Sequence, residues 1–196
     1  MNTFDPKPVT LELGSICLVP MCADHAPALL EASRAPEIWE HMTIPQPRDI
    51  EAMDAFVRDA IAARDAGTQV PFVVEVDGEV AGSTRYLEIR RGDLRLEIGW
   101  TWLAREFWRT TVNTTCKLLL LRHAFEVLGA ARVEMKTDVR NERSQDAIER
   151  IGAKQEGVLR SYQRVWTGRQ RDTAMFSIIA TEWPAVKAEL ERKLGG

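Results

Sequence analysis

Hydrophobic residues follow two different spacings along the first half of this 196-residue chain. After Asp49, which can cap a helix, apolar side chains recur every three or four positions from Met53 to Ile61. This spacing predicts an amphipathic helix. An Asp77-Gly78 pair then separates two β-rich runs, and such a pair is typical of a two-residue hairpin turn.

Strict alternation marks the segment from Leu94 to Trp102. Its apolar residues, including Leu96, Ile98 and Trp100, would share one face of a strand, and Glu97 would point to the other. Over the rest of the chain the spacing of the apolar residues alternates between that of a helix and that of a strand. It predicts a helix at about 112–127, a strand at 132–137, a helix at 142–151, strands at about 154–166 and 171–180, and a last helix from 182.

The predicted elements follow the order β-α-α-β-β-β-α-β-α-β-β-α. This order combines hairpins with strand–helix–strand connections. It therefore predicts the α/β class, as an α+β mixed sheet with helices on both faces. A length of 196 residues is compatible with one such domain.

Composition and charge narrow the classes of function. The chain has 26 basic and 29 acidic side chains, and 45% of its residues are hydrophobic, which is typical of a globular protein. The small net charge of −3 argues against a nucleic-acid partner. No basic and apolar leader begins the chain, and no apolar run approaches the ~20 residues that span a membrane, so we expect a cytoplasmic protein without a membrane partner. Three scattered cysteines favour neither a disulfide framework nor a metal site.

Four short motifs in the second half carry a family resemblance. They are DVRNERS at 138–144, AIERIGA at 147–153, EGVLR at 156–160 and RDTAMFS at 171–177. In this order they resemble the signature of the GNAT superfamily of N-acetyltransferases, and specifically its ribosomal-protein (RimJ/RimL-type) branch. The resemblance covers roughly residues 10–185, which we expect to form the acetyltransferase domain, with 186–196 as the end of the last helix and a tail.

The resemblance implies that acetyl-CoA is the cosubstrate and that a loop before the central helix binds its diphosphate. In this family the loop follows the pattern Q/R-x-x-G-x-G/A, and here Trp108, Thr111 and Asn113 occupy the three defined positions. The glycines are therefore missing, although backbone N–H groups at a helix start still favour an anion. An ordinary strand-to-helix turn with a degraded pocket is the alternative. The residues expected to bind the coenzyme are Trp102, Leu103, Trp108, Arg109, Thr110, Thr111, Val112, Asn113, Thr114 and Asn141.

Two residues are the leading candidates for acid–base chemistry. Ser144 matches the motif serine of the family and would protonate the departing thiolate, unless it only bonds backbone groups at the helix start. Glu97 is the first choice as the base that removes the amine proton, and a salt-bridged strand glutamate is the alternative. Glu134 is a second candidate, and Glu75 and Glu156 remain open.

The sequence therefore predicts an acetyl-CoA-dependent N-acetyltransferase that uses no metal. It would move an acetyl group to a primary amine, either a protein N-terminus or a small molecule, by direct attack. A non-catalytic acyl-CoA-binding module and a fold relic that binds no coenzyme are the two alternatives. A homodimer is left open.

Overall fold

The computed structural model describes residues 4–195. Within these residues, eight strands form a single sheet in the order β1-β2-β3-β4-β5-β6-β8-β7, in which only β5 and β6 run parallel. The strands are β1 (Leu11–Leu13), β2 (Ile16–Pro20), β3 (Val70–Val76), β4 (Glu79–Arg90), β5 (Arg95–Leu103), β6 (Arg132–Asp138), β7 (Lys154–Arg164) and β8 (Gln170–Ile179).

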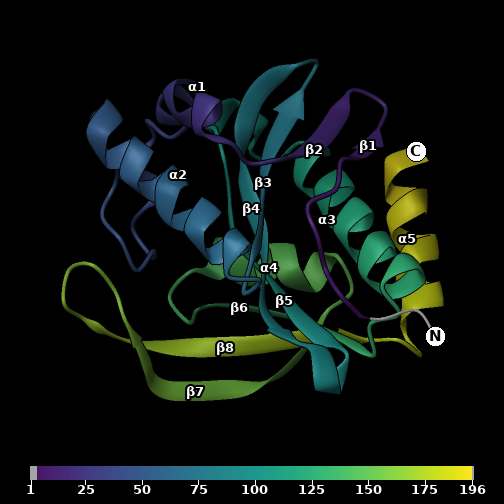
Figure 1. The fold of residues 1–196 in the computed structure, drawn as a ribbon. Helices are drawn as coiled ribbons and strands as arrows, with labels where there is room; N and C mark the ends of the chain where they lie inside the picture. Colours follow the sequence, from purple (N-terminus) through teal and green to yellow (C-terminus); the bar gives the residue numbers. More distant parts are fainter. Residues whose placement is uncertain (1–3, 196) are drawn as a thin grey trace.

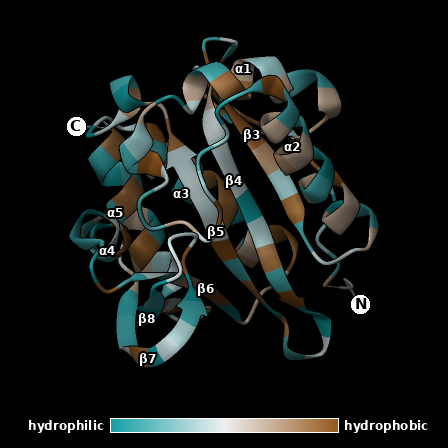
Figure 2. Ribbon diagram, turned by 90° about the vertical axis from the view of Figure 1, so that its left-hand side faces the viewer, coloured by the Kyte–Doolittle hydropathy of each residue, from teal (hydrophilic) through white to brown (hydrophobic). Residues whose placement is uncertain are grey.

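The helices cover the two faces of this sheet (Figure 1). They are α1 (Ala26–Ala32), α2 (Ile50–Asp65), α3 (Val112–Arg122), α4 (Glu142–Arg150) and α5 (Trp183–Gly195). α1 and α2 pack on one face with β3 and β4, whereas α3 packs on the other, beside β1, β2 and α5. Figure 2 shows hydrophobic and hydrophilic residues alternating along α2, as expected for a helix with one buried face.

The predicted mixed α/β fold is confirmed, and the observed order adds one strand at its start. β1 pairs antiparallel with β2 through a short turn. The expected boundary between residues 185 and 186 falls inside α5, where Val186 and Leu190 are buried in the core beside α3. Residue 196, the last of the expected tail, lies outside the described residues.

β5 contains a β-bulge at Trp100, where φ is 52°. β4 pairs Ser83 with Trp102 and Arg85 with Gly99, so two residues of β5 lie opposite one residue of β4. An extra residue inverts the alternation of the strand beyond it. The bulge therefore changes which face receives the side chains of the second half of β5.

The prediction that alternate residues from Leu94 to Trp102 share one face is wrong for this reason. Leu96 and Ile98 are buried in the core on the α3 side, whereas Trp102 is buried in the core formed with α1 and α2. Trp100 packs against that second core, and its ring centroid lies 6.1 Å from that of Phe56 on α2. The two tryptophans thus lie on the face that local alternation assigned to Glu97.

Candidate active site

The two parallel strands at the centre of the sheet part at the middle of their length. β5 and β6 are paired from Arg95 with Arg132 to Glu97 with Glu134, and the pairing ends there. Both strands continue beyond this point, to Leu103 and Asp138. Their facing backbone groups are free of each other over these last residues and can bind a ligand between the strands.

Glu97 lies at the last paired position before the strands part. Its side chain is only 4% exposed and its carboxylate accepts a hydrogen bond of 2.8 Å from Lys136 Nζ on β6. Burial raises the pKa of Glu97, and the nearby Lys136 ammonium opposes this effect. A Cβ at Gly99 would lie 2.8 Å from Glu97 Oε1, so the glycine makes room for the carboxylate.

The other carboxylates considered from the sequence lie in more exposed ion pairs. Glu134 accepts hydrogen bonds of 2.8 Å from both Arg95 and Arg132, and Arg132 also pairs with the carboxylate of Glu156. Glu75 Oε1 lies 3.9 Å from His25. Glu97 and Glu134 face each other at the end of the paired segment, and Glu97 is the best shielded of the four carboxylates.

A polar cluster that joins distant segments of the chain lies further along β6. Asp138 is fully buried and accepts hydrogen bonds from Arg169 and from the Arg140 backbone N–H. His41, from the segment between α1 and α2, places Nδ1 3.5 Å from Asp138 Oδ2, and its carbonyl accepts a hydrogen bond from Arg171. More than 90 residues separate His41 from Asp138 in the chain, so no local pattern could show that they meet.

The loop between β5 and α3 has one residue in the left-handed conformation, and it is Arg109, with φ of 62°. Thr111 has φ of −74° and already belongs to the helical region, so this position needs no glycine. The hydroxyl of Thr110 donates to the Phe107 carbonyl and accepts from the Val112 N–H. The loop is thus stabilised by its own threonine in place of the missing glycines.

The residues of this loop that are predicted to bind the coenzyme differ in their exposure to solvent. Arg109, Thr110 and Thr111 are exposed, whereas Val112 and Thr114 are buried. The N–H groups of the first helical turn, including that of Asn113, have no partner within α3, as at every helix start. The Val112 N–H is already bonded to Thr110, so exposed side chains and the N–H groups of Asn113 and Thr114 occur together where an anion would bind.

Two contacts connect this loop to the rest of the candidate site. The indole N–H of Trp108 donates to the Leu103 carbonyl at the end of β5, at 2.8 Å. The Arg143 guanidinium lies over the Trp108 ring, 4.1 Å from its centroid. Arg143 belongs to α4, so the loop, the end of β5 and the start of α4 are held side by side.

Asn141 and Ser144 lie together at the start of α4. The Asn141 side chain caps the helix by accepting from the Ser144 backbone N–H, at 3.1 Å. The cap uses the backbone of Ser144 and not its hydroxyl. A structural role for Asn141 is therefore present in the fold, and the Ser144 hydroxyl is not needed for it.

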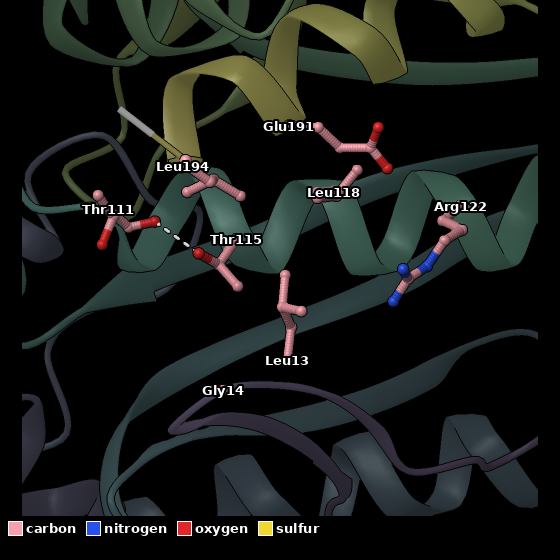
Figure 3. A pocket seen from close by; sticks show the side chains of 9 residues that line it. Leu13, Gly14, Thr111, Thr115, Leu118, Arg122, Glu191 and Leu194 are labelled. Atoms are coloured by element: carbon pink, nitrogen blue, oxygen red, sulfur yellow. Dashed lines mark hydrogen bonds between the residues drawn. The ribbon is translucent and has the colours of Figure 1, made fainter.

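Two cavities flank these elements. Figure 3 shows one of about 390 Å³ between the β1–β2 turn, α3 and the end of α5, where Thr115 donates to the Thr111 carbonyl. Another, of about 730 Å³, lies between the segment after α1, the start of α2 and the β7–β8 hairpin. Trp39 and Trp166 both line the larger cavity, and Trp166 donates to the Trp39 carbonyl at 3.0 Å. The carboxylates of Glu37, Glu40 and Asp49 also line it.

A family model for the acetyltransferase (GNAT) domain matches residues 15–154, more than two thirds of the chain. The chain belongs to the GNAT acetyltransferase family. Its family motifs from 138 to 144 lie within this match, at the end of β6 and the start of α4. Acetyl transfer to amines is accordingly the general activity of this GNAT enzyme.

Similar proteins support the same assignment. "Putative ribosomal N-acetyltransferase YdaF" of Bacillus subtilis (strain 168) is 32% identical over 111 residues, which span 57% of this chain and 60% of that relative. A GCN5-related N-acetyltransferase structure from Brucella melitensis is 28% identical, with a TM-score of 0.90 over 96% of this chain and 86% of the other. Mycobacterium smegmatis RimJ, solved with CoA-disulfide, has a TM-score of 0.81 at 24% identity over 96% and 95% of the two chains. These similarities agree with the resemblance to the RimJ/RimL-type branch.

No helix in residues 4–195 is both long enough and apolar enough to cross a membrane. In the same part of the chain, no three histidine, cysteine, aspartate or glutamate side chains converge in a way that could hold a metal ion.

Proposed function

We propose that this GNAT enzyme transfers the acetyl group of acetyl-CoA to a primary amine by direct attack. The amine nitrogen forms a bond to the thioester carbonyl carbon, the carbon–sulfur bond breaks, and coenzyme A leaves as the thiol. The amine loses one proton and the departing sulfur gains one. The observation that carries the proposal is the buried carboxylate of Glu97 at the point where β5 and β6 part.

Glu97 is proposed as the group that receives the amine proton. Its burial favours the protonated form, so it can hold a proton at a pH where an exposed carboxylate cannot. Lys136 keeps the carboxylate in place and partly offsets this effect. Glu97 has one cationic partner, whereas the carboxylate of Glu134 is occupied by two arginines, so Glu97 is the better placed of the two to accept a proton from a substrate.

Ser144 is proposed as the donor of the proton to the thiolate, directly or through a water molecule. It lies at the start of α4, whose Arg143 contacts the loop through Trp108. The coenzyme diphosphate would then bind the loop from Arg109 to Thr114, and the pantetheine arm would lie beside Trp102, Leu103 and Asn141. This arrangement is supported by the free helix-start N–H groups and the exposed Arg109.

The acceptor amine is proposed to approach through the larger cavity. Trp39 in its wall packs against Trp102 of β5, with ring centroids 5.7 Å apart, which connects the cavity to the parted strands. Carboxylates and tryptophan rings are both favourable to a cation. A small cationic amine and a basic protein N-terminus both fit this description, and the assay below compares them.

Two measurements test the proposed function. Saturating acetyl-CoA should raise the melting temperature of the purified protein, because a ligand that binds only the folded state stabilises it by mass action. Thiol release should then be detected with at least one amine from a set of peptides, polyamines and aminoglycosides. Glu97→Gln should bind acetyl-CoA normally but release thiol much more slowly and lose the acidic limb of the pH–rate profile.

Each alternative has its own outcome. Stabilisation by acetyl-CoA without thiol release from any amine would indicate a non-catalytic acyl-CoA-binding module. An unchanged melting temperature would indicate a fold that no longer binds the coenzyme. Turnover in Glu97→Gln with an unaltered pH profile would contradict the assignment of Glu97 while leaving the transferase activity intact.

A further inference from the structure

A buried lysine on α3 has no role in the function proposed so far. Lys117 is only 5% exposed, and its ammonium donates a hydrogen bond of 2.8 Å to the hydroxyl of Thr101 on β5. The same hydroxyl lies 2.8 Å from that of Thr84 on β4. A chain of three polar side chains therefore runs from the helix through two neighbouring strands.

Within residues 4–195 no carboxylate forms an ion pair with the Lys117 ammonium. Burial lowers the pKa of Lys117 to about 8, and no acidic side chain opposes this effect in that part of the chain. Its neighbour Cys116 stays neutral, because burial raises the pKa of that thiol to about 12. Among the charged groups of β4 and β5, Arg85 and Glu97 are engaged with Phe56 and Lys136. Glu88 pairs with Arg90, and Arg95 pairs with Glu134.

A buried ammonium without a carboxylate partner destabilises the folded state, because no opposite charge offsets the free energy of its desolvation. An apolar side chain of the same length would pack in this position without that cost. Nine of the eleven residues of α3 are buried, and the others among them that carry a long side chain are leucines. Lys117 is therefore the charged residue among the buried residues of α3, and stability does not explain its presence.

The place of Thr101 supplies that reason. Thr101 follows the bulge residue Trp100 and belongs to the part of β5 that has left β6. The backbone there is proposed to face the acetyl group of the coenzyme. During attack by the amine, negative charge develops first on the carbonyl oxygen and then on the departing sulfur, and a fixed positive charge in a water-poor site stabilises both.

We propose that Lys117 is a positioning residue of the acetyl site, which holds the β5 bulge through Thr101 and stabilises the negative charge that develops during acetyl transfer. This inference rests on the proposed acetyltransferase function and deepens it. Lys117 acts from behind the strand, through the Thr101 hydroxyl and through its charge. It touches neither the acetyl group nor the amine in this arrangement.

Lys117→Met separates this role from a structural one. Methionine keeps the length of the side chain and removes the charge, so the melting temperature should stay the same or rise. At the same time kcat should fall about ten- to a hundredfold, with the KM for acetyl-CoA changed by less than about threefold, because the effect is on the transition state. A parallel loss of melting temperature and kcat would assign Lys117 to the fold alone, and wild-type kcat would overturn the proposal.

Thr101 provides the matched pair of variants. Thr101→Ser keeps the hydroxyl and should retain nearly wild-type kcat. Thr101→Val removes the hydroxyl at almost constant volume, leaves the Lys117 ammonium without this partner, and should lower both the melting temperature and kcat. Equal kcat values in the two variants would contradict the positioning path through Thr101.

A binding measurement distinguishes failure of this inference from failure of the proposed function. The thiol of bound coenzyme A can be titrated by the ultraviolet absorbance of its thiolate, and this needs no turnover. The pKa of the bound thiol should be about one unit lower in the wild type than in Lys117→Met, because the charge favours the thiolate. Equal thiol pKa values in the wild type and in Lys117→Met would overturn the electrostatic role, even if the enzyme proves to be inactive. A lower thiol pKa in the wild type, together with no thiol release from any amine, would refute only the transferase activity.

Discussion

Replacing Lys136 by methionine should raise the pKa of Glu97 and move the acidic limb of the pH–rate profile to higher pH. In the wild type the Lys136 ammonium lies 2.8 Å from Glu97 Oε2 and opposes the effect of burial on this carboxyl. The variant removes that opposing charge and leaves the burial unchanged. A base works only when deprotonated, so a higher pKa means that activity is lost at a higher pH on acidification.

The size of the shift follows from the geometry. The two side chains are 4% and 12% exposed, so solvent screens their interaction little. An opposite charge at such a distance lowers the pKa of a carboxyl by ~1–3 units, and its removal should raise the pKa of Glu97 by the same amount. At ~1.36 kcal/mol per unit, the change corresponds to about 1.4–4 kcal/mol of interaction with the ionised form.

The assay is kcat/KM for the acceptor amine, measured by thiol release across the pH range. Arg95→Met is the matched control, because it removes an equally short ion pair between the same two strands, to Glu134 instead of Glu97. The control should leave the acidic limb within about half a unit of the wild type, since Glu134 keeps its bond to Arg132. An acidic limb at the same pH in Lys136→Met and in the wild type would refute the assignment of Glu97 as the base.

Three further predictions concern single positions. Gly99→Ala should lower kcat/KM towards that of Glu97→Gln without unfolding the protein, because the new methyl group would lie 2.8 Å from Glu97 Oε1. Wild-type kinetics in a variant with a native circular dichroism spectrum would contradict this. Thr111→Gly should weaken acetyl-CoA binding in isothermal titration, since Thr111 is already in the helical region and glycine only adds freedom to the helix start; tighter binding would show that the loop lacks close backbone approach. Asp138→Asn should lower the melting temperature at neutral pH and flatten its decline in acid. Burial raises the pKa of Asp138, but the hydrogen bonds from Arg169 and the Arg140 N–H outweigh burial and lower the pKa overall. The ionised carboxylate therefore stabilises the fold above its unfolded pKa of ~3.9, and this stabilisation is lost as the pH falls through the lower pKa of the folded state. Identical calorimetric profiles for the variant and the wild type would contradict the argument.

Much of the fold was predictable because its signals are local. The Asp49 side chain caps α2 as expected, by accepting from the Ala52 N–H at 2.8 Å. The Asp77-Gly78 turn joins β3 to β4, and both residues have the positive φ that such a turn requires. Caps, turns and periodicities involve residues only a few positions apart, so the chain records them directly.

The candidate site was predictable only in part. The motifs from 138 to 144 and the loop before α3 indicated the segments, and the structure places these segments side by side through Trp108 and Arg143. The conformation of the loop was not predictable, because the left-handed residue is Arg109 and not the position where the family pattern has glycine. The role of each site residue stays a prediction for the experiments above.

By itself, the sequence determined the order of the elements from β2 onwards, the family and the segments that surround the candidate site. Only the tertiary structure revealed the bulge at Trp100 and the point where β5 and β6 separate. It also revealed the hydrogen bonds between Lys136 and Glu97 and between Lys117 and Thr101. The physical reason is that periodicity and capping are local properties of the chain. Strand register, bulges and buried ion pairs depend on which distant segments become neighbours, and that choice is made by packing the whole sheet and its helices together.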